Sequence, residues 1–158
     1  MFNKNFIVIC ISSTIAAFPP MAVVLLGGII TSQIMMKDSL ATVPMTLMII
    51  GIAISAPIAS RFMSIWGRQK GFLFSSLLSC LALIICSIAI YLENFFIFAL
   101  GNFLIGSSQA FIHQYRFAAS ESVAKELIPR SISIILLLGI ISALLSSNFA
   151  EYFKDFFP

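Results

Sequence analysis

Charged residues are scarce in this chain of 158 residues, where they make up 9% of the sequence. An ordinary soluble domain has about 25%. Hydrophobic residues make up 60% of the chain, and its mean hydropathy is +1.08. A soluble domain of this size has too little polar surface to cover so many apolar side chains. The composition therefore excludes a soluble enzyme, a disordered tail and a nucleic-acid-binding protein, and it predicts a protein whose main solvent is lipid.

The residues that catalysis and metal binding need are also few. The chain has one histidine and three cysteines, and the cysteines lie in apolar stretches without a C-x-x-C pair. It has no nucleophile elbow, no phosphate-binding loop and no zinc-ligand spacing. The net charge is only +3, and the nine Lys and Arg residues form no basic patch in the sequence. We therefore expect no enzyme activity, no metal, no cofactor and no nucleic-acid partner.

Five apolar segments each have the length of a transmembrane helix. They cover residues 6–30, 41–60, 71–92, 95–115 and 131–150. The apolar run of the first continues past Pro19 and Pro20, which favours an uncleaved helix over a signal peptide. The alternating polarity of a membrane barrel is absent. The sequence thus predicts an all-α integral membrane protein with five spans, in one partial transmembrane domain over residues 1–158.

The basic residues predict how this protein is oriented in the bilayer. With the N-terminus in the cytoplasm, two basic residues lie outside, Lys37 and Lys154. The other seven of the nine lie inside: Lys4, Arg61, Arg68, Lys70, Arg116, Lys125 and Arg130. Such a bias is a strong positive-inside signal. We expect a multi-pass protein with a cytoplasmic N-terminus.

Polar residues follow one face of the fourth span. On a helix, Asn102, Gly106, Gln109, His113 and Arg116 fall within about 80° of arc. One interpretation is that Asn102, Gln109 and His113 line a permeation cavity with Arg116 at its cytoplasmic mouth. The other is that they hydrogen-bond to neighbouring helices and only hold the bundle together. No Asp or Glu lies within a span, although proton-coupled carriers commonly have one there.

Small residues recur at helical spacing in several spans. Ser75 and Ser79 are four residues apart, as are Gly106 and Ala110, and further small residues lie between 139 and 146. This spacing is common where membrane helices approach closely. It therefore indicates helix packing and identifies no family.

The loop between the second and third spans resembles the signature loop of the major facilitator superfamily, G-x-x-x-D-[RK]-x-G-[RK]-[RK]. The candidate residues of this loop are Ser60, Arg61, Ser64, Gly67, Arg68 and Lys70. Gly67 and Arg68 fit the pattern, whereas Ser60 and Ser64 replace its glycine and aspartate. Lys70 is basic one position late.

A second resemblance lies at the inner end of the fourth span. Residues 114–119, Q-Y-R-F-A-A, and the segment P-R-S-I-S at 129–133 are similar to a subgroup of bacterial carriers of this superfamily. The order of the five spans resembles helices 1–5 of the N-terminal six-helix half of such a carrier. The resemblance implies a transporter in the bacterial inner membrane, whose full fold has twelve spans. Helix five of many members has a Gly-Pro where this chain has Ser146 and Ser147.

These observations lead to three functional hypotheses. In the first, the chain is a truncated part of a major facilitator transporter of a small solute and does not transport alone, because alternating access needs two halves. In the second, a partner chain or a second copy supplies the missing helices. In the third, it is a small structural or assembly membrane protein without transport activity. The sequence does not identify the solute.

Overall fold

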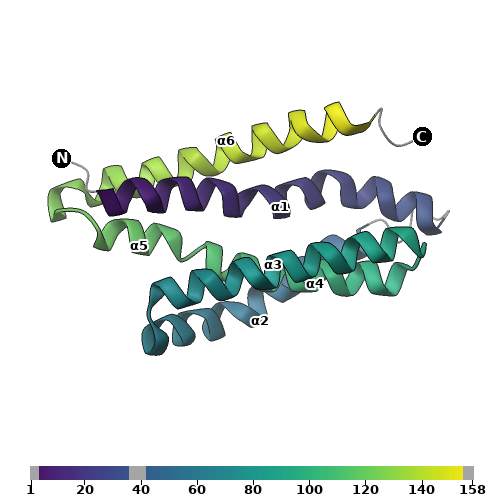
Figure 1. Cartoon of the computed structure of the whole chain (residues 1–158), viewed down its shortest axis with the longest axis horizontal. Coiled ribbons are helices and arrows are strands. Elements are labelled where there is room, and N and C mark those ends of the chain that lie inside the picture. The colour runs from purple at the N-terminus through teal and green to yellow at the C-terminus, as the bar shows by residue number, and fades with distance from the viewer. Residues whose placement is uncertain (1–3, 36–41, 155–158) are drawn as a thin grey trace.

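The computed structural model describes residues 4–35 and 42–154. Within these ranges, the description covers the backbone alone for residues 25–26, 28–35 and 149–154. The chain forms long helices joined by short turns (Figure 1). These are α1 (Lys4–Met35), α2 (Val43–Trp66), α3 (Arg68–Tyr91), α4 (Phe95–Ile112), α5 (Tyr115–Glu121) and α6 (Ile128–Lys154), with a 3-10 turn, η2 (Lys125–Leu127), before α6. The described residues contain no strand.

Five stretches of the described residues are long and apolar enough to cross a membrane, which confirms the predicted fold class. They are Lys4–Val24, Val43–Trp66, Arg68–Tyr91, Phe95–Glu121 and Lys125–Asn148. The chain is therefore a multi-pass membrane protein by its helix composition. Lys37, predicted to lie outside, and the start of the second predicted span at residue 41 fall outside the described residues.

The fourth span lies at the centre of the bundle. In its most apolar window 56% of the residues are buried, against 11–22% in the other four spans. Helix α4 packs against α2 and α3 on one side and against α1 on the other, while α1 pairs with α6 (Figure 1). Asn102, Gly106 and Gln109 of the polar stripe thus lie on the most enclosed helix, where a buried polar side chain must meet a protein partner or a cavity.

Glycines let α2 and α4 approach closely. A Cβ built on Gly106 would overlap the carbonyl oxygen of Met48, and one on Gly51 would overlap that of Phe103. The obstacles are backbone atoms, which cannot rotate away. Ser75 of α3 also donates its hydroxyl to the carbonyl of Ser108, at 3.0 Å. Small residues in these positions therefore bring the backbones of α2, α3 and α4 together, as the sequence pattern indicated.

The pair α1–α6 packs through serines. Ser142 of α6 donates its hydroxyl to the carbonyl of Thr14 in α1, at 2.9 Å. Three serines of α6 are fully buried: Ser131, Ser142 and Ser146. At the basic end of the bundle, Phe6 packs with Ala119 and Ile135, which joins α1, α5 and α6. This end carries the cytoplasmic loops in the predicted orientation.

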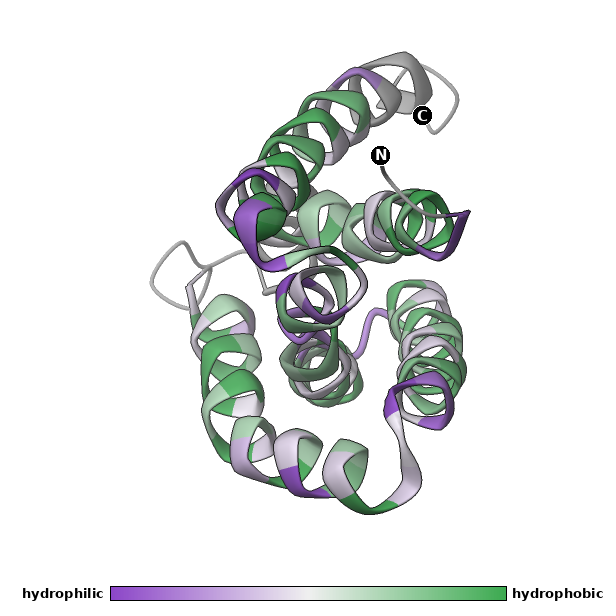
Figure 2. Ribbon diagram, turned by 90° about the vertical axis from the view of Figure 1, so that its left-hand side faces the viewer, coloured by the Kyte–Doolittle hydropathy of each residue, from purple (hydrophilic) through white to green (hydrophobic). Residues whose placement is uncertain are grey.

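The outward faces of the helices are apolar. Large aliphatic side chains are more than 40% exposed along α1, α3 and α6, for example Ile11, Leu77 and Leu137. Figure 2 shows the helices as largely hydrophobic, with the hydrophilic colour limited to short stretches. In water these faces would drive aggregation. In a bilayer they contact lipid, and the helices are held together by packing and hydrogen bonds instead.

Two turns position the central helix. Between α3 and α4, Glu93 has a positive φ of 49°, and Asn94 accepts hydrogen bonds from the amides of Phe96 and Ile97. The two helices therefore form a tight antiparallel hairpin. At the inner end, α4 ends at Ile112 and a new helix begins at Tyr115, within the predicted span. Arg116 therefore belongs to α5, and its direction does not follow from the helical wheel of α4.

Two glycine-to-alanine variants test this packing. We expect Gly106→Ala to destabilise the protein by about 1–3 kcal/mol, because the added methyl overlaps the backbone of α2. Gly139→Ala is the control, since a Cβ there meets nothing within 4 Å and the helix propensity changes equally. Thermal unfolding in detergent measures both. Equal midpoints for the two variants would contradict the close α2–α4 contact.

Candidate functional site

A cavity of about 390 Å³ lies between α1, α6 and the inner end of α4. Its lining residues come from α1, α4, the start of α5 and α6, so the cavity is a gap between helices and not a feature of one loop. Helix α1 provides Ser13, Ala17 and Met21. The α4–α5 region provides Gln109, Ile112, His113, Tyr115 and Arg116, and α6 provides Ile135, Leu136, Gly139, Ile140 and Ala143. We call it the α1–α4–α6 cavity.

The structure brings three of the four predicted cavity residues together here. Gln109, His113 and Arg116 all line the α1–α4–α6 cavity. His113 and Arg116 are exposed, whereas Gln109 is half-buried and its Oε1 is shielded from solvent. This Oε1 has no hydrogen-bond partner among the described residues. Gln109 therefore lines the cavity, while its Oε1 is a shielded acceptor without a hydrogen bond.

Asn102, the fourth predicted residue, is placed elsewhere. It is 1% exposed and donates its side-chain N–H to the carbonyl of Phe98 on its own helix, at 2.9 Å. Phe98 belongs to a buried cluster of α2, α3 and α4 side chains, and Val23 and Val24 of α1 pack against this cluster. The side chain of Asn102 is therefore hydrogen-bonded within its own helix in a buried part of the bundle, and it does not line the cavity.

Small side chains create the space. A Cβ built on Gly139 would meet nothing within 4 Å, so this part of α6 faces open volume. Ala17 of α1 and Ala143 of α6 line the same volume. The small residues between 139 and 146 thus have two roles, because Ser142 and Ser146 pack in the bundle whereas Gly139 leaves a gap. The expectation that all of them permit close packing was wrong for Gly139.

Arg116 gives the cavity its only full positive charge among the lining residues. Its Nε donates to the carbonyl of His113, at 3.1 Å, and its guanidinium lies 5.8 Å from the centre of the Phe117 ring. No carboxylate pairs with it in the described part of the chain. Among the described residues that line the cavity, none is acidic. The site is therefore apolar in its walls and positive at its mouth.

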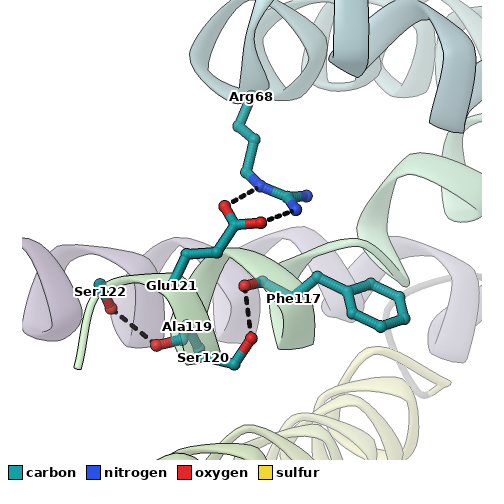
Figure 3. Close-up of polar contacts among 6 residues, drawn as sticks. All are labelled: Arg68, Phe117, Ala119, Ser120, Glu121 and Ser122. Carbon is teal, nitrogen blue, oxygen red and sulfur yellow. Dashed lines mark hydrogen bonds and ion pairs between the residues drawn. The ribbon is translucent and has the colours of Figure 1, made fainter. Parts of the chain in front are cut away.

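The loop that resembles the signature motif forms a one-residue turn. Gly67 has a φ of +83°, which favours glycine, and it separates α2 from α3. Arg68 follows at the start of α3 and forms a bidentate ion pair with Glu121 at the end of α5 (Figure 3). Its Nε and Nη2 donate to the two carboxylate oxygens, at 2.6 and 2.5 Å. This pair joins segments 53 residues apart.

The other loop candidates make only local contacts. Ser64 donates its hydroxyl to the carbonyl of Arg61, at 2.8 Å, and Lys70 lies 5.4 Å from the centre of the Trp66 ring. Ser60, Arg61, Ser64 and Lys70 are all exposed. Among the loop candidates, Arg68 is therefore the residue that links two parts of the fold.

A second cavity, of about 700 Å³, lies between α1 and α3 and also reaches α5. It contains none of the four predicted cavity residues. Arg68, its charged lining residue, is already paired with Glu121. Elsewhere, the described residues hold no cluster of three His, Cys, Asp or Glu side chains that suits a metal ion.

Sequence reasoning missed two parts of the site. One is the ion pair of Arg68 with Glu121, because no local sequence pattern links two residues that are 53 positions apart. The contributions of α1 and α6 to the cavity were also missed. The signal that could have found them is the spacing of Ser13, Ala17 and Met21, which places small and flexible residues on one face of α1.

Comparison with known proteins adds one relative. The chain is 26% identical over 156 residues to a protein named riboflavin transporter RfnT, from Brucella anthropi. The match covers 99% of this chain and 39% of the relative, so the chain spans well under half of the relative's length. No family model matches the chain, and no solved structure matches it. The chain is thus a transporter-related membrane protein, a distant relative of a bacterial transporter and not of an enzyme.

The ion pair between Arg68 and Glu121 can be tested by a double-mutant cycle with Arg68→Gln and Glu121→Gln. We expect a coupling free energy of about 0.2–1 kcal/mol, because the two side chains are 29% and 61% exposed and are screened by water. Unfolding in detergent at low and high salt measures it, and the coupling should fall with salt. Strictly additive single effects would show that the two side chains do not interact.

Proposed function

We propose that this chain takes part in membrane transport of a small solute as part of a transporter of the major facilitator superfamily. The observation that carries the proposal is the α1–α4–α6 cavity, which holds Gln109, His113 and Arg116 on apolar walls. Polar side chains at membrane depth are costly and commonly mark the path of a solute. The relative reported above is named a riboflavin transporter, and the match to it covers 99% of the present chain.

The five spans are one wall of such a path. Carriers of this superfamily enclose the solute between two helical halves that rock against each other. The α1–α4–α6 cavity is bounded by helices of this chain, with Tyr115 and Arg116 of α5 among its lining residues, and His113 and Arg116 remain exposed at it. We therefore infer that transport requires further helices opposite this wall, from additional sequence, a partner chain or a second copy.

Riboflavin is the first solute to test, because it is the one named for the relative. The cavity of about 390 Å³ is within the ordinary size range of small-molecule sites. Its apolar walls suit a fused aromatic ring, and its polar residues suit a solute with hydrogen-bonding groups at the edge. The site proposed for the solute is Gln109, His113 and Arg116.

A gene deletion in the organism that encodes the chain tests this function. We expect the deletion to lower uptake of labelled riboflavin and the wild-type gene to restore it. Gly139→Phe should fail to restore uptake, because a ring placed on Gly139 fills the open volume of the cavity. Leu137→Phe is the matched control on the same helix, since Leu137 is 58% exposed on the lipid side. All variants are compared at equal membrane abundance.

Two outcomes would contradict the proposal. Unchanged uptake of riboflavin and of a panel of small solutes in the deletion strain would favour a structural or assembly protein. Restoration of uptake by Gly139→Phe would show that the cavity is not on the solute path. The purified chain, reconstituted alone as a monomer, should give no solute flux. Clear flux from the monomer would overturn the inference that a second wall is needed.

A further inference from the structure

The second cavity, between α1 and α3, has a polar end and an apolar body. Asn5, Arg68 and Gln69 line it at the basic end of the bundle, where α1 and α3 begin. Its apolar lining residues on these two helices lie deeper: Val8, Ile9, Ile15, Ala16, Phe72 and Leu73. Val8, Ile15 and Leu73 are 59–68% exposed, so the described residues do not close the cavity on this side. We call it the α1–α3 cavity.

The α1–α3 cavity extends over about half of the membrane thickness. From Asn5 to Ala16 it follows α1 for about 16 Å, at a rise of about 1.5 Å per residue. The hydrocarbon core of a bilayer is about 30 Å thick, so one leaflet contributes about 15 Å. The described residues 17–24 of α1 do not line this cavity, and neither do residues 77–91 of α3. A packed transmembrane helix needs a groove along the whole span, whereas a lipid molecule reaches through a single leaflet.

The polar end has hydrogen-bond donors that the protein does not use. Arg68 donates from its Nε and Nη2 to Glu121, which leaves the Nη1 amino group (Figure 3). The side-chain amides of Asn5 and Gln69 are exposed and bond to no described residue. The phosphate group of a lipid offers acceptor oxygens, so it suits donors of this kind.

Positive charge is in excess at this end of the cavity. Glu121 offsets the charge of Arg68. Lys4 and Lys70 each lie one position from a residue that lines the polar end, and both are exposed. Neither lysine forms an ion pair with a described residue. Basic side chains at the membrane surface attract anionic lipids, so the charge here complements an anionic headgroup.

From these observations we propose that the α1–α3 cavity binds one anionic phospholipid of the leaflet at the basic end. This is the cytoplasmic leaflet in the predicted orientation. An acyl chain lies along the apolar lining residues of α1 and α3, and the phosphate accepts hydrogen bonds from Asn5, Arg68 and Gln69. Among the described residues Tyr115, which is buried, is the one that lines both cavities. The lipid site is therefore distinct from the α1–α4–α6 cavity and does not depend on the proposed function.

Two serines of α3 provide a matched pair of variants. Ser76 lines the α1–α3 cavity, whereas Ser87 lies further along the helix and does not. Both are exposed, and each donates its hydroxyl to the carbonyl four residues earlier, at 3.0 Å. Ser76→Phe thus places a ring where the acyl chain lies, while Ser87→Phe makes the same chemical change outside the cavity.

The purified full chain is titrated in detergent with phosphatidylglycerol or with phosphatidylcholine of the same acyl chains, and native mass spectrometry counts the bound lipids. We expect one saturable phosphatidylglycerol in the wild type and in Ser87→Phe. Ser76→Phe should bind it about tenfold more weakly, because the ring occupies the space of the chain. Phosphatidylcholine, whose headgroup has no net charge, should bind the wild type about fivefold more weakly than phosphatidylglycerol.

A charge of either sign at residue 69 tests the headgroup. Gln69→Glu should weaken phosphatidylglycerol binding about fivefold, and Gln69→Lys should strengthen it by a similar factor. Both variants change an exposed side chain of similar length. Phosphatidylcholine should respond much less to either variant, because its headgroup carries both charges.

Several results would overturn the lipid site. They are equal phosphatidylglycerol binding by Ser76→Phe and Ser87→Phe, or no saturable lipid on the wild type. Equal binding of the two lipids, or no response to the charge at residue 69, overturns the selection of an anionic headgroup. Displacement of the lipid by riboflavin would assign the cavity to a solute, and a co-purified membrane protein lost in Ser76→Phe would assign it to a helix.

The readouts also separate the lipid site from transport and from misfolding. Thermal unfolding establishes that each variant is folded. Where Ser76→Phe is unstable, Ala16→Leu fills the deep end of the same cavity from α1. The uptake phenotype of Gly139→Phe decides on the proposed function whatever the lipid titration gives.

Discussion

Lipid cannot hydrogen-bond to the protein, and this constraint governs how the polar groups of the chain are arranged. Most of the serines in the spans donate to a carbonyl three or four residues earlier on their own helix, for example Ser87 to Leu83 and Ser107 to Phe103. Asn102 does the same with the carbonyl of Phe98. Such bonds make a polar residue acceptable at membrane depth without involving a neighbour. A polar side chain that is not satisfied in this way therefore stands out.

The bundle consists of two groups of helices, α2–α3–α4 and α1–α6, and α1 connects the second group to the central helix α4. Helices α2, α3 and α4 are held by glycine contacts and by the bond from Ser75 to the carbonyl of Ser108. Helices α1 and α6 are held by the bond from Ser142 to the carbonyl of Thr14. At the basic end the ion pair of Arg68 and Glu121 ties α3 to α5, which itself packs on α1 and α6. The cavity lies on α4, between these two sets of contacts.

The number and order of the spans could be predicted from the sequence, because each one is a long apolar run between polar turns. The break between α4 and α5 could not be predicted, since no proline or glycine marks residues 113 and 114. The helical wheel correctly put Gln109 and His113 on one face. It could not show that α1 covers that face at the level of Asn102 and leaves it open at Gln109. A wheel gives direction around one helix, whereas a cavity depends on how far its neighbours lie at each level.

The unpaired acceptor of Gln109 is therefore different in kind from the two unpaired serine hydroxyls. A serine hydroxyl in a helix can rotate to donate to a carbonyl of the preceding turn, so Ser79 and Ser146 each have a local solution at little cost. The Oε1 of Gln109 is an acceptor only, and the backbone amides of the preceding turns in α4 are already used in the helix. Because this oxygen is shielded from solvent, a donor for it would have to come from another helix. The described helices direct no donor to it, so this oxygen is a shielded acceptor without a hydrogen bond, which is unfavourable for the free energy of folding.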